Sequence, residues 1–446
     1  MWSRRASKEP PNRIAKRRLQ TLRWELASKG EQSFLAKLGP GLITGAADDD
    51  PSGIGTYSQV GAQFGYGLSW SLLFSLPFMT VIQDVAAQIG AVTGRGIAAN
   101  LRRHYPRPVL WSAVTLLLFA NVINLGADLS AMGAVMQMLL GGEVVVYTIG
   151  FGLICVLLET LLDYRQYAAV LKFTTLSLFA YVAVVFTVHV PWGEALRAVL
   201  VPHIEPTAAF ATGFVAVLGT TISPYLFFWQ AAQEIEEERR NHSKPLYVSP
   251  RQAGPEMARI RQDTLIGMTF SNLVAIFIVF AAAATLHVRG VTTINTAAEA
   301  AQALEPVAGR FAFALFAFGI IGTGLLAVPV LAGSAAYAVS EMLGRTASLD
   351  SKPNRARLFY GTIAATTLAG ALLQYFGVNP VRALYWSAVI NGVLAAPLMA
   401  VMMLIVCNPK AMGRLTLSGK GAILGWAATA VMAGATGLFF VSMFWS

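Results

Sequence analysis

Long apolar runs separated by short polar loops make up most of this chain. A helix needs about 20 mainly apolar residues to cross a bilayer. The pattern therefore predicts an all-α polytopic membrane protein with eleven transmembrane helices. The predicted spans are 36–66, 67–93, 109–138, 143–161, 166–189, 208–233, 264–287, 309–340, 357–377, 380–407 and 420–444. The first, sixth and eighth are long or polar enough to be broken or to protrude.

Composition and charge agree with this pattern. The chain is 55% hydrophobic and only 13% charged, with a mean hydropathy of +0.58, whereas soluble domains average about 25% charged residues. If the N-terminus is cytoplasmic, 29 of the 33 Lys and Arg residues fall on the inner side. This bias predicts a bacterial inner-membrane protein with its N-terminus inside and its C-terminus outside. It also makes a nucleic-acid partner a poor explanation of the net charge of +10.

Two polar stretches interrupt apolar spans. "GAADDDPSGIG" lies in the first span and "GTTISPYLFFWQ" in the sixth. Matching breaks at the start of two halves are typical of inverted-repeat transporters with a site at the midplane. The predicted organisation is a basic segment (1–35), a first repeat of helices 1–5 (36–189), a second of helices 6–10 (190–407), and a loop with helix 11 (408–446).

The chemistry of the breaks favours a cation site. Proline removes a backbone donor and glycine lets the chain leave helical geometry. The freed carbonyl groups must face protein or a polar cavity. An ordinary proline kink needs no adjacent carboxylates, so the Asp48–Asp50 triplet indicates function. In a regular helix these side chains diverge by about 100° per residue. At least one is therefore expected to line the approach path or to be protonated beside its neighbours.

These residues carry a family resemblance that covers nearly all of the chain. "GPGLITGAADDDPSGIGTYSQVGAQFGYG" resembles the first helix of the Nramp metal transporters, whose signature there is Asp-Pro-Gly-Asn. "IGAVTGRGIA", "GADLSAM", Asn272 and "NPKAMG" resemble later family segments. The resemblance implies a LeuT-type 5+5 inverted repeat with helices 1 and 6 broken. It also implies import of a divalent transition metal, usually coupled to protons.

The departures from that family change the expected cargo. Asp50 matches the signature Asp, but Gly53 replaces its Asn, Thr220 an Ala, and Ser223 a metal-binding Met. Thioethers select soft metals, whereas carboxylate, carbonyl, hydroxyl and water oxygens suit Mg²⁺, Ca²⁺ and Mn²⁺. The chain thus resembles the divergent Nramp-related magnesium transporters. Its implied metal site consists of Asp50, Gly53, Thr220 and Ser223, in a wide pocket that holds a partly hydrated ion.

Other polar residues are assigned to the surroundings of that site or to its pathway. They are Asp48, Asp49, Thr221, Tyr225, Gln230 and Asp128. Tyr225 and Gln230 stand where the family has histidines, and Ala131 replaces a family Glu, so transport without proton coupling is expected. Asp128 has three interpretations: a remnant of the proton path, a vestibule charge, or a hydrogen-bond partner of Asn124.

Several alternatives remain open at this point. A proton-coupled Mn²⁺ or Fe²⁺ importer keeps the protein class but changes the cargo. A transporter-like receptor and an organic-solute carrier are more distant alternatives, and no enzyme motif or cofactor site is apparent. We expect a monomer whose partners are the divalent cation and the bilayer. After the sixth span, "EIEEERR" predicts a solvated helix extension with Glu236 paired to Arg240.

Overall fold

The computed structural model describes residues 40–161 and 178–445, which form helices and no strands. The predicted basic segment 1–35 and the first half of the fifth predicted span (166–177) lie outside these residues. The α-helices are α2 (Pro40–Asp48), α3 (Pro51–Phe64), α4 (Ser69–Thr93), α5 (Ile97–His104), α6 (Arg107–Leu140), α7 (Val144–Leu161), α9 (Phe179–Thr187), α10 (Trp192–Leu200), α11 (Ala208–Thr221), α12 (Pro224–Arg240), α13 (Ala253–Thr285), α14 (Ala297–Ala301), α15 (Glu305–Ala308), α16 (Ala312–Met342), α17 (Arg357–Leu372), α18 (Pro380–Val406), α19 (Pro409–Met412) and α20 (Gly419–Trp445).

Within the described residues, eight helical segments are long and apolar enough to cross a membrane. They correspond to the second, third, fourth, sixth, seventh, eighth, tenth and eleventh predicted spans. The first predicted span consists of two short helices, and α17 has only 16 residues. The all-helical membrane fold is therefore confirmed, whereas the number of eleven spans stays a prediction.

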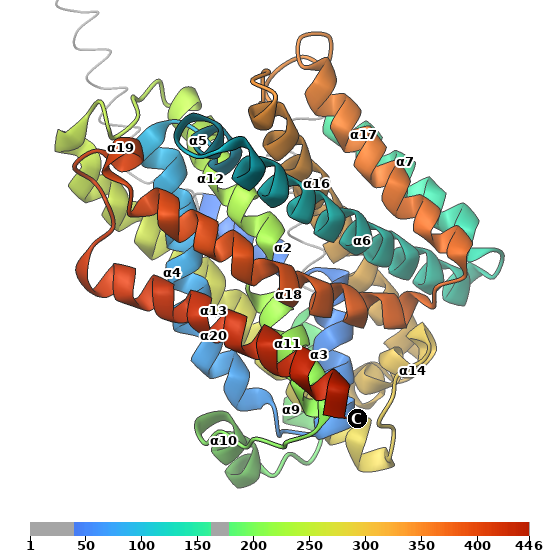
Figure 1. Ribbon diagram of the computed structural model, residues 1–446. Coiled ribbons are helices and arrows are strands. Elements are labelled where there is room, and N and C mark those ends of the chain that lie inside the picture. The colour runs from blue at the N-terminus through green and yellow to red at the C-terminus, as the bar shows by residue number, and fades with distance from the viewer. Residues whose placement is uncertain (1–39, 162–177, 446) are drawn as a thin grey trace, which may run out of the picture. The chain divides into compact units, whose positions relative to one another are not determined.

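The broken sixth span lies at the centre of the bundle. In the most apolar 18-residue stretch of Ala208–Arg240, 89% of the residues are buried. The corresponding buried fractions are 22% for α7 and 28% for α20. α11 packs against α18, and α12 packs against α4 and α16. Figure 1 shows α18 and α20 running side by side, with the helices of the first break behind them. The peripheral helices expose large apolar side chains, such as Phe119, Leu157 and Phe440, as a lipid-facing surface requires.

Local sequence explains where the two breaks fall. Pro51 and Pro224 each occupy the first position of a helix, where a missing amide hydrogen costs nothing. Asp50 caps α3 by accepting a hydrogen bond from the Gly53 amide. The eighth predicted span, by contrast, is not broken: α16 is continuous from Ala312 to Met342 although it contains Pro329.

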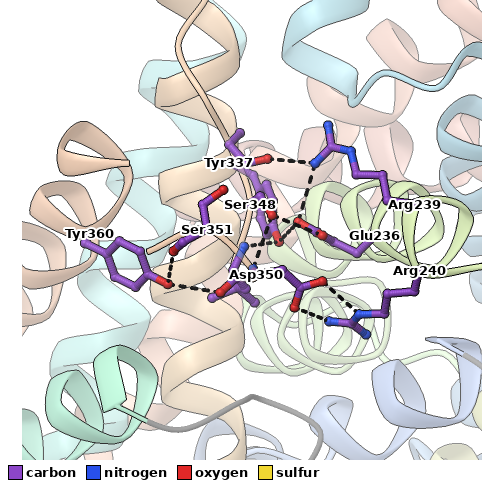
Figure 2. Close-up of polar contacts among 10 residues, drawn as sticks. Glu236, Arg239, Arg240, Tyr337, Ser348, Asp350, Ser351 and Tyr360 are labelled. Carbon is purple, nitrogen blue, oxygen red and sulfur yellow. Dashed lines mark hydrogen bonds and ion pairs between the residues drawn. The ribbon is translucent and has the colours of Figure 1, made fainter. Parts of the chain in front are cut away.

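The predicted helix extension after the sixth span is present and its last four residues reach solvent, but the expected pair of Glu236 with Arg240 is wrong. α12 does continue to Arg240, but Glu236 is buried and accepts hydrogen bonds from the Tyr337 and Ser348 hydroxyl groups. Arg240 instead forms a bidentate ion pair with Asp350, in which both hydrogen bonds are 2.9 Å long. Figure 2 shows this network between α12 and the segment after α16. Tertiary partners thus replace the expected pair within the helix.

Candidate metal-binding site

Asp50 is held in one orientation by four hydrogen-bond donors. Its Oδ1 accepts from the Gly53 amide at 2.7 Å and from the Ser52 hydroxyl at 2.8 Å. Its Oδ2 accepts from Asn124 Nδ2 at 3.1 Å and from the Tyr225 hydroxyl at 3.3 Å. Because α3, α6 and α12 all contribute, the carboxylate lies where the two broken helices meet. These four donors match the roughly four lone-pair sites of a carboxylate, so a cation that binds Asp50 has to replace one or more of them.

The hydroxyl groups at the second break are hydrogen-bonded to the backbone of α11. Ser223 donates its hydroxyl proton backwards, to the carbonyl oxygens of Gly219 at 3.0 Å and Thr220 at 2.9 Å. These carbonyl groups belong to the last turn of α11, which lacks helical partners of its own. Thr221 donates to the Val217 carbonyl at 3.0 Å. Both hydroxyl oxygens keep their lone pairs, which is what a hard cation requires of such a ligand.

Tyr225 connects the two breaks directly. From the first turn of α12 its hydroxyl donates to the Ala47 carbonyl in α2 at 3.0 Å and also contacts Asp50. One turn further along α12, the Gln230 side chain accepts a hydrogen bond from Thr44 of α2 and donates to Glu234 at 3.1 Å. Both residues therefore tie α12 to α2. In this arrangement Gln230 belongs to the α2–α12 contact rather than to the surroundings of Asp50.

Asp48 and Asp49 do not diverge as a regular helix would require. α2 ends at Asp48, so the break falls inside the aspartate triplet. Both carboxylates turn towards α13, where Ser271 contacts Asp48 Oδ2 at 2.7 Å and Asp49 Oδ1 at 3.1 Å. The predicted divergence of the three side chains by helical geometry is therefore wrong, because the chain is not helical at Asp49 and Asp50.

Asp128 has no hydrogen bond to Asn124. The Asn124 amide group points at Asp50 instead, and the buried Asp128 carboxylate has no side chain as a hydrogen-bond partner. Asp128 lies beside the backbone of Ser52 and close enough to Asp50 to interact with its charge. This corrects the interpretation of Asp128 as a partner of Asn124 and brings a second carboxylate to the first break.

Unpaired oxygen atoms are concentrated around the two breaks. Among the described residues, the buried side-chain oxygens without a hydrogen-bond partner include Asp48 Oδ1 and Asn124 Oδ1, and the Asp128 carboxylate faces only the Ser52 backbone amide. Asp48, Asp50 and Asp128 are all close enough to Tyr225 for their charges to act on it. A buried acceptor without a donor carries a free-energy cost that a bound cation would remove.

The site is closed to water in this arrangement. The nine candidate residues other than glycine are at most 3% exposed, and Gly53 is also buried. A Cβ atom on Gly53 would lie 3.2 Å from Thr220 Oγ1 and 3.4 Å from Tyr57 Cε2. The expected wide pocket is therefore not present beside Gly53 in this closed arrangement. Among the described residues, no three carboxylate, imidazole or thiolate groups converge to hold an ion by themselves.

Two further residues contribute to the surroundings of the site without a clear signal in the sequence. Ser271 orients Asp48 and Asp49, and the Tyr57 phenol is buried beside Thr220 and the aspartates. Ser271 directly precedes Asn272, which the family resemblance had already singled out. That neighbour was the one available signal. Tyr57 lies two turns into α3, and nothing in its sequence surroundings distinguishes it from a core aromatic residue.

The fold and the two interrupted helices define a class: an all-helical membrane bundle with a buried polar site between its helix breaks. A family model described as "Natural resistance-associated macrophage protein-like", or Nramp, matches residues 41–442. Because this match spans nearly the whole chain, the protein belongs to the Nramp family.

Similar proteins agree with this assignment. The chain is 26% identical over 416 residues to a divalent metal cation transporter, MntH, of Klebsiella pneumoniae subsp. pneumoniae, covering 91% of this chain and 94% of the relative. A crystal structure of the Eremococcus coleocola manganese transporter has a TM-score of 0.70 at 15% identity, covering 92% and 87% of the two chains. Mhp1, a nucleobase-cation-symport-1 transporter in a closed conformation, has a TM-score of 0.55 at 14% identity, covering 92% of each chain. The structural matches support the LeuT-type fold.

Proposed function

We propose that this protein transports a divalent cation across the membrane by alternating access, with Mg²⁺ preferred and Mn²⁺ as a second substrate. The observation that carries the proposal is the set of buried carboxylates and other side-chain oxygens, several without a donor, around Asp50 where the two breaks meet. Family membership supports the divalent-cation class, since the similar Klebsiella protein is named a divalent metal cation transporter.

The preference for Mg²⁺ rests on the donor types. Carboxylate, hydroxyl and amide oxygens surround the breaks, and the position at which the family carries a metal-binding Met holds Ser223. Mg²⁺ keeps several waters and uses one or two carboxylates. In the proposal Asp50 is the central ligand, and Thr220, Ser223 and carbonyl oxygens near Gly53 contact the ion directly or through water. Asp48 and Asp49 give the approach a negative field.

We place the protein in a bacterial inner membrane as a monomer with a cytoplasmic N-terminus. The membrane potential then favours entry of a divalent ion by about 4.6 kcal/mol per 100 mV, twice the value for a single charge. This driving force is available without protons. None of the five histidines lies near Asp50: they are His104, His189, His203, His242 and His287, at helix ends or in loops.

A second candidate is a proton-coupled importer of Mn²⁺ or Fe²⁺. Two observations favour it. The buried Asp128 carboxylate has no side chain as a hydrogen-bond partner and is close enough to Asp50 to feel its charge, which suits a group that carries a proton. The similar protein from Eremococcus coleocola is a manganese transporter.

Proton flux separates these two candidates. We expect proteoliposomes with an inside-negative potential to take up Mg²⁺ without acidification of the lumen, because no relay of histidines reaches the site. Uptake is followed with a Mg²⁺-sensitive dye and lumenal pH with a second dye, and protein-free liposomes report the leak. A fixed ratio of protons to Mg²⁺ entering together would overturn the uncoupled mechanism.

A further inference from the structure

A large basic pocket lies away from the candidate metal site. It has a volume of about 810 Å³ and is formed by the segment from Gly94 to Arg103, by α12, and by the end of α16 with the residues that follow. None of the candidate metal-site residues lines it. The charge count assigns this end of the bundle to the cytoplasm. Figure 2 shows part of its wall, where Arg239 of α12 faces the segment after α16.

Five arginines line this pocket, against two acidic residues. The arginines are Arg95, Arg102, Arg103, Arg239 and Arg345, and the acids are Glu236 and Glu341. Both acids already have partners. Glu236 accepts hydrogen bonds from Tyr337 and Ser348, and Glu341 accepts from the Ala99 amide at 3.1 Å, at the start of α5. The pocket therefore carries a net positive charge.

The positive charge of three arginines is not balanced by neighbouring acids. Among the described residues, Arg102, Arg103 and Arg345 form no ion pair. The pKa of Arg95 is lowered by partial burial and by the charges of Arg103 and Arg102. Partial burial and the nearby charges of Arg103, Arg95 and Lys410 likewise lower the pKa of His104. Cations of the chain thus repel one another at this point, and an anion would relieve that repulsion.

The shape of the pocket favours a ligand larger than a single halide ion. A volume of about 810 Å³ is within the range of small-molecule sites. Gly96 and Gly344 line it without side chains, and the Arg102 guanidinium lies directly against Gly344, whose φ is +68°. Guanidinium groups bind phosphate oxygens in pairs of parallel hydrogen bonds. A divalent cation, by contrast, would be repelled from this pocket.

We propose that this pocket binds a polyphosphate anion at the cytoplasmic end of the bundle. The shared chemistry is two or more phosphate groups close together, which a nucleotide in solution and a polyphosphorylated lipid headgroup both supply. Arg239 places one guanidinium of the pocket on α12, the same helix that carries Tyr225 of the metal site. Ligand binding is therefore expected to act on the position of α12.

Binding to the full-length protein tests this proposal. Purified protein in EDTA is titrated with ATP and with inorganic triphosphate, and in a second arm it is mixed with phosphatidylcholine vesicles containing phosphatidylinositol bisphosphate. We expect saturable binding in at least one arm. The triple variant Arg102→Ala, Arg103→Ala, Arg345→Ala should lower the affinity about tenfold or more, because charge-assisted contacts to phosphate are lost. The arm that responds identifies the source of the phosphate groups.

A charge-matched variant controls for the loss of positive charge in general. Arg107→Ala, Arg251→Ala, Arg355→Ala removes three exposed arginines outside the pocket and should bind as the wild type does. Asp50→Asn should also bind the anion normally, so that a failure of the transport proposal does not affect this test. Absence of binding in both arms, or equal loss in the two triple variants, would overturn the proposal.

Discussion

Replacing Asp50 with asparagine should lower divalent-cation uptake by about 100-fold or more while leaving the protein folded. Asparagine keeps one oxygen in the position that accepts the Gly53 amide and the Ser52 hydroxyl, so the cap of α3 is retained. It removes the negative charge that faces the two breaks. Loss of groups that merely support a metal ligand already costs about 10–100-fold, and loss of the central ligand should cost more.

The measurement is initial uptake into proteoliposomes at matched protein content, together with the thermal midpoint of each variant. Asp350→Asn is the matched control, since that carboxylate is exposed and pairs with Arg240 at the opposite end of α12 from the second break. Its uptake should equal that of the wild type. If Asp50→Asn carries the cation at the wild-type rate, Asp50 is only a helix cap and the proposed site is wrong.

Replacing Gly219 with alanine should strongly destabilise the bundle. A Cβ atom at this position would lie 2.0 Å from the Ala388 carbonyl oxygen and 2.4 Å from the Gly392 amide nitrogen, both in α18. Backbone atoms cannot move aside as a side chain can, so α11 and α18 must separate. Overpacking of this kind typically costs about 1–3 kcal/mol and sometimes more. The thermal midpoint in detergent should fall clearly, and uptake with it, because Gly219 also accepts the Ser223 hydroxyl.

Gly434→Ala provides the matched control for that substitution. Gly434 lies in α20, and a Cβ atom there has no neighbour within 4 Å. Alanine is favoured over glycine in a helix by about 1 kcal/mol, so this variant should be as stable as the wild type or more so. Equal thermal midpoints for Gly219→Ala and Gly434→Ala would show that the close approach of α11 and α18 does not constrain the fold.

The sequence was sufficient to place the two breaks. Pro51 and Pro224 follow polar residues within apolar runs, and local chemistry alone ends one helix and starts the next there. The assignment of Asp50 to the meeting point of the breaks followed from the family signature. Its contacts with Asn124 and Tyr225 agree with that position, although they do not test its role as a ligand.

What the sequence could not supply was the set of long-range partners. Asp48 and Asp49 share Ser271, more than 200 positions away along the chain, and the direction of a side chain at a helix break follows no periodicity. Glu236 was misassigned for a related reason. Spacing within one helix suggested Arg240, but Tyr337 and Ser348 of another segment bury the carboxylate. Periodicity describes one helix at a time, whereas these contacts depend on how several helices pack.

The most direct test of the central claim is competition between cations for transport by the wild-type protein. Proteoliposomes loaded with a Mg²⁺-sensitive dye receive Mg²⁺ alone, or Mg²⁺ with an equal concentration of Mn²⁺, Ca²⁺ or Cd²⁺. Ser223 supplies an oxygen at the position where the family has a Met thioether, so the site should not favour soft metals. We therefore predict saturable Mg²⁺ uptake that Mn²⁺ reduces. Cd²⁺ should reduce it no more than Mn²⁺ does. Absence of Mg²⁺ uptake, together with uptake of Cd²⁺ or Mn²⁺ by the same vesicles, would contradict a magnesium-preferring site.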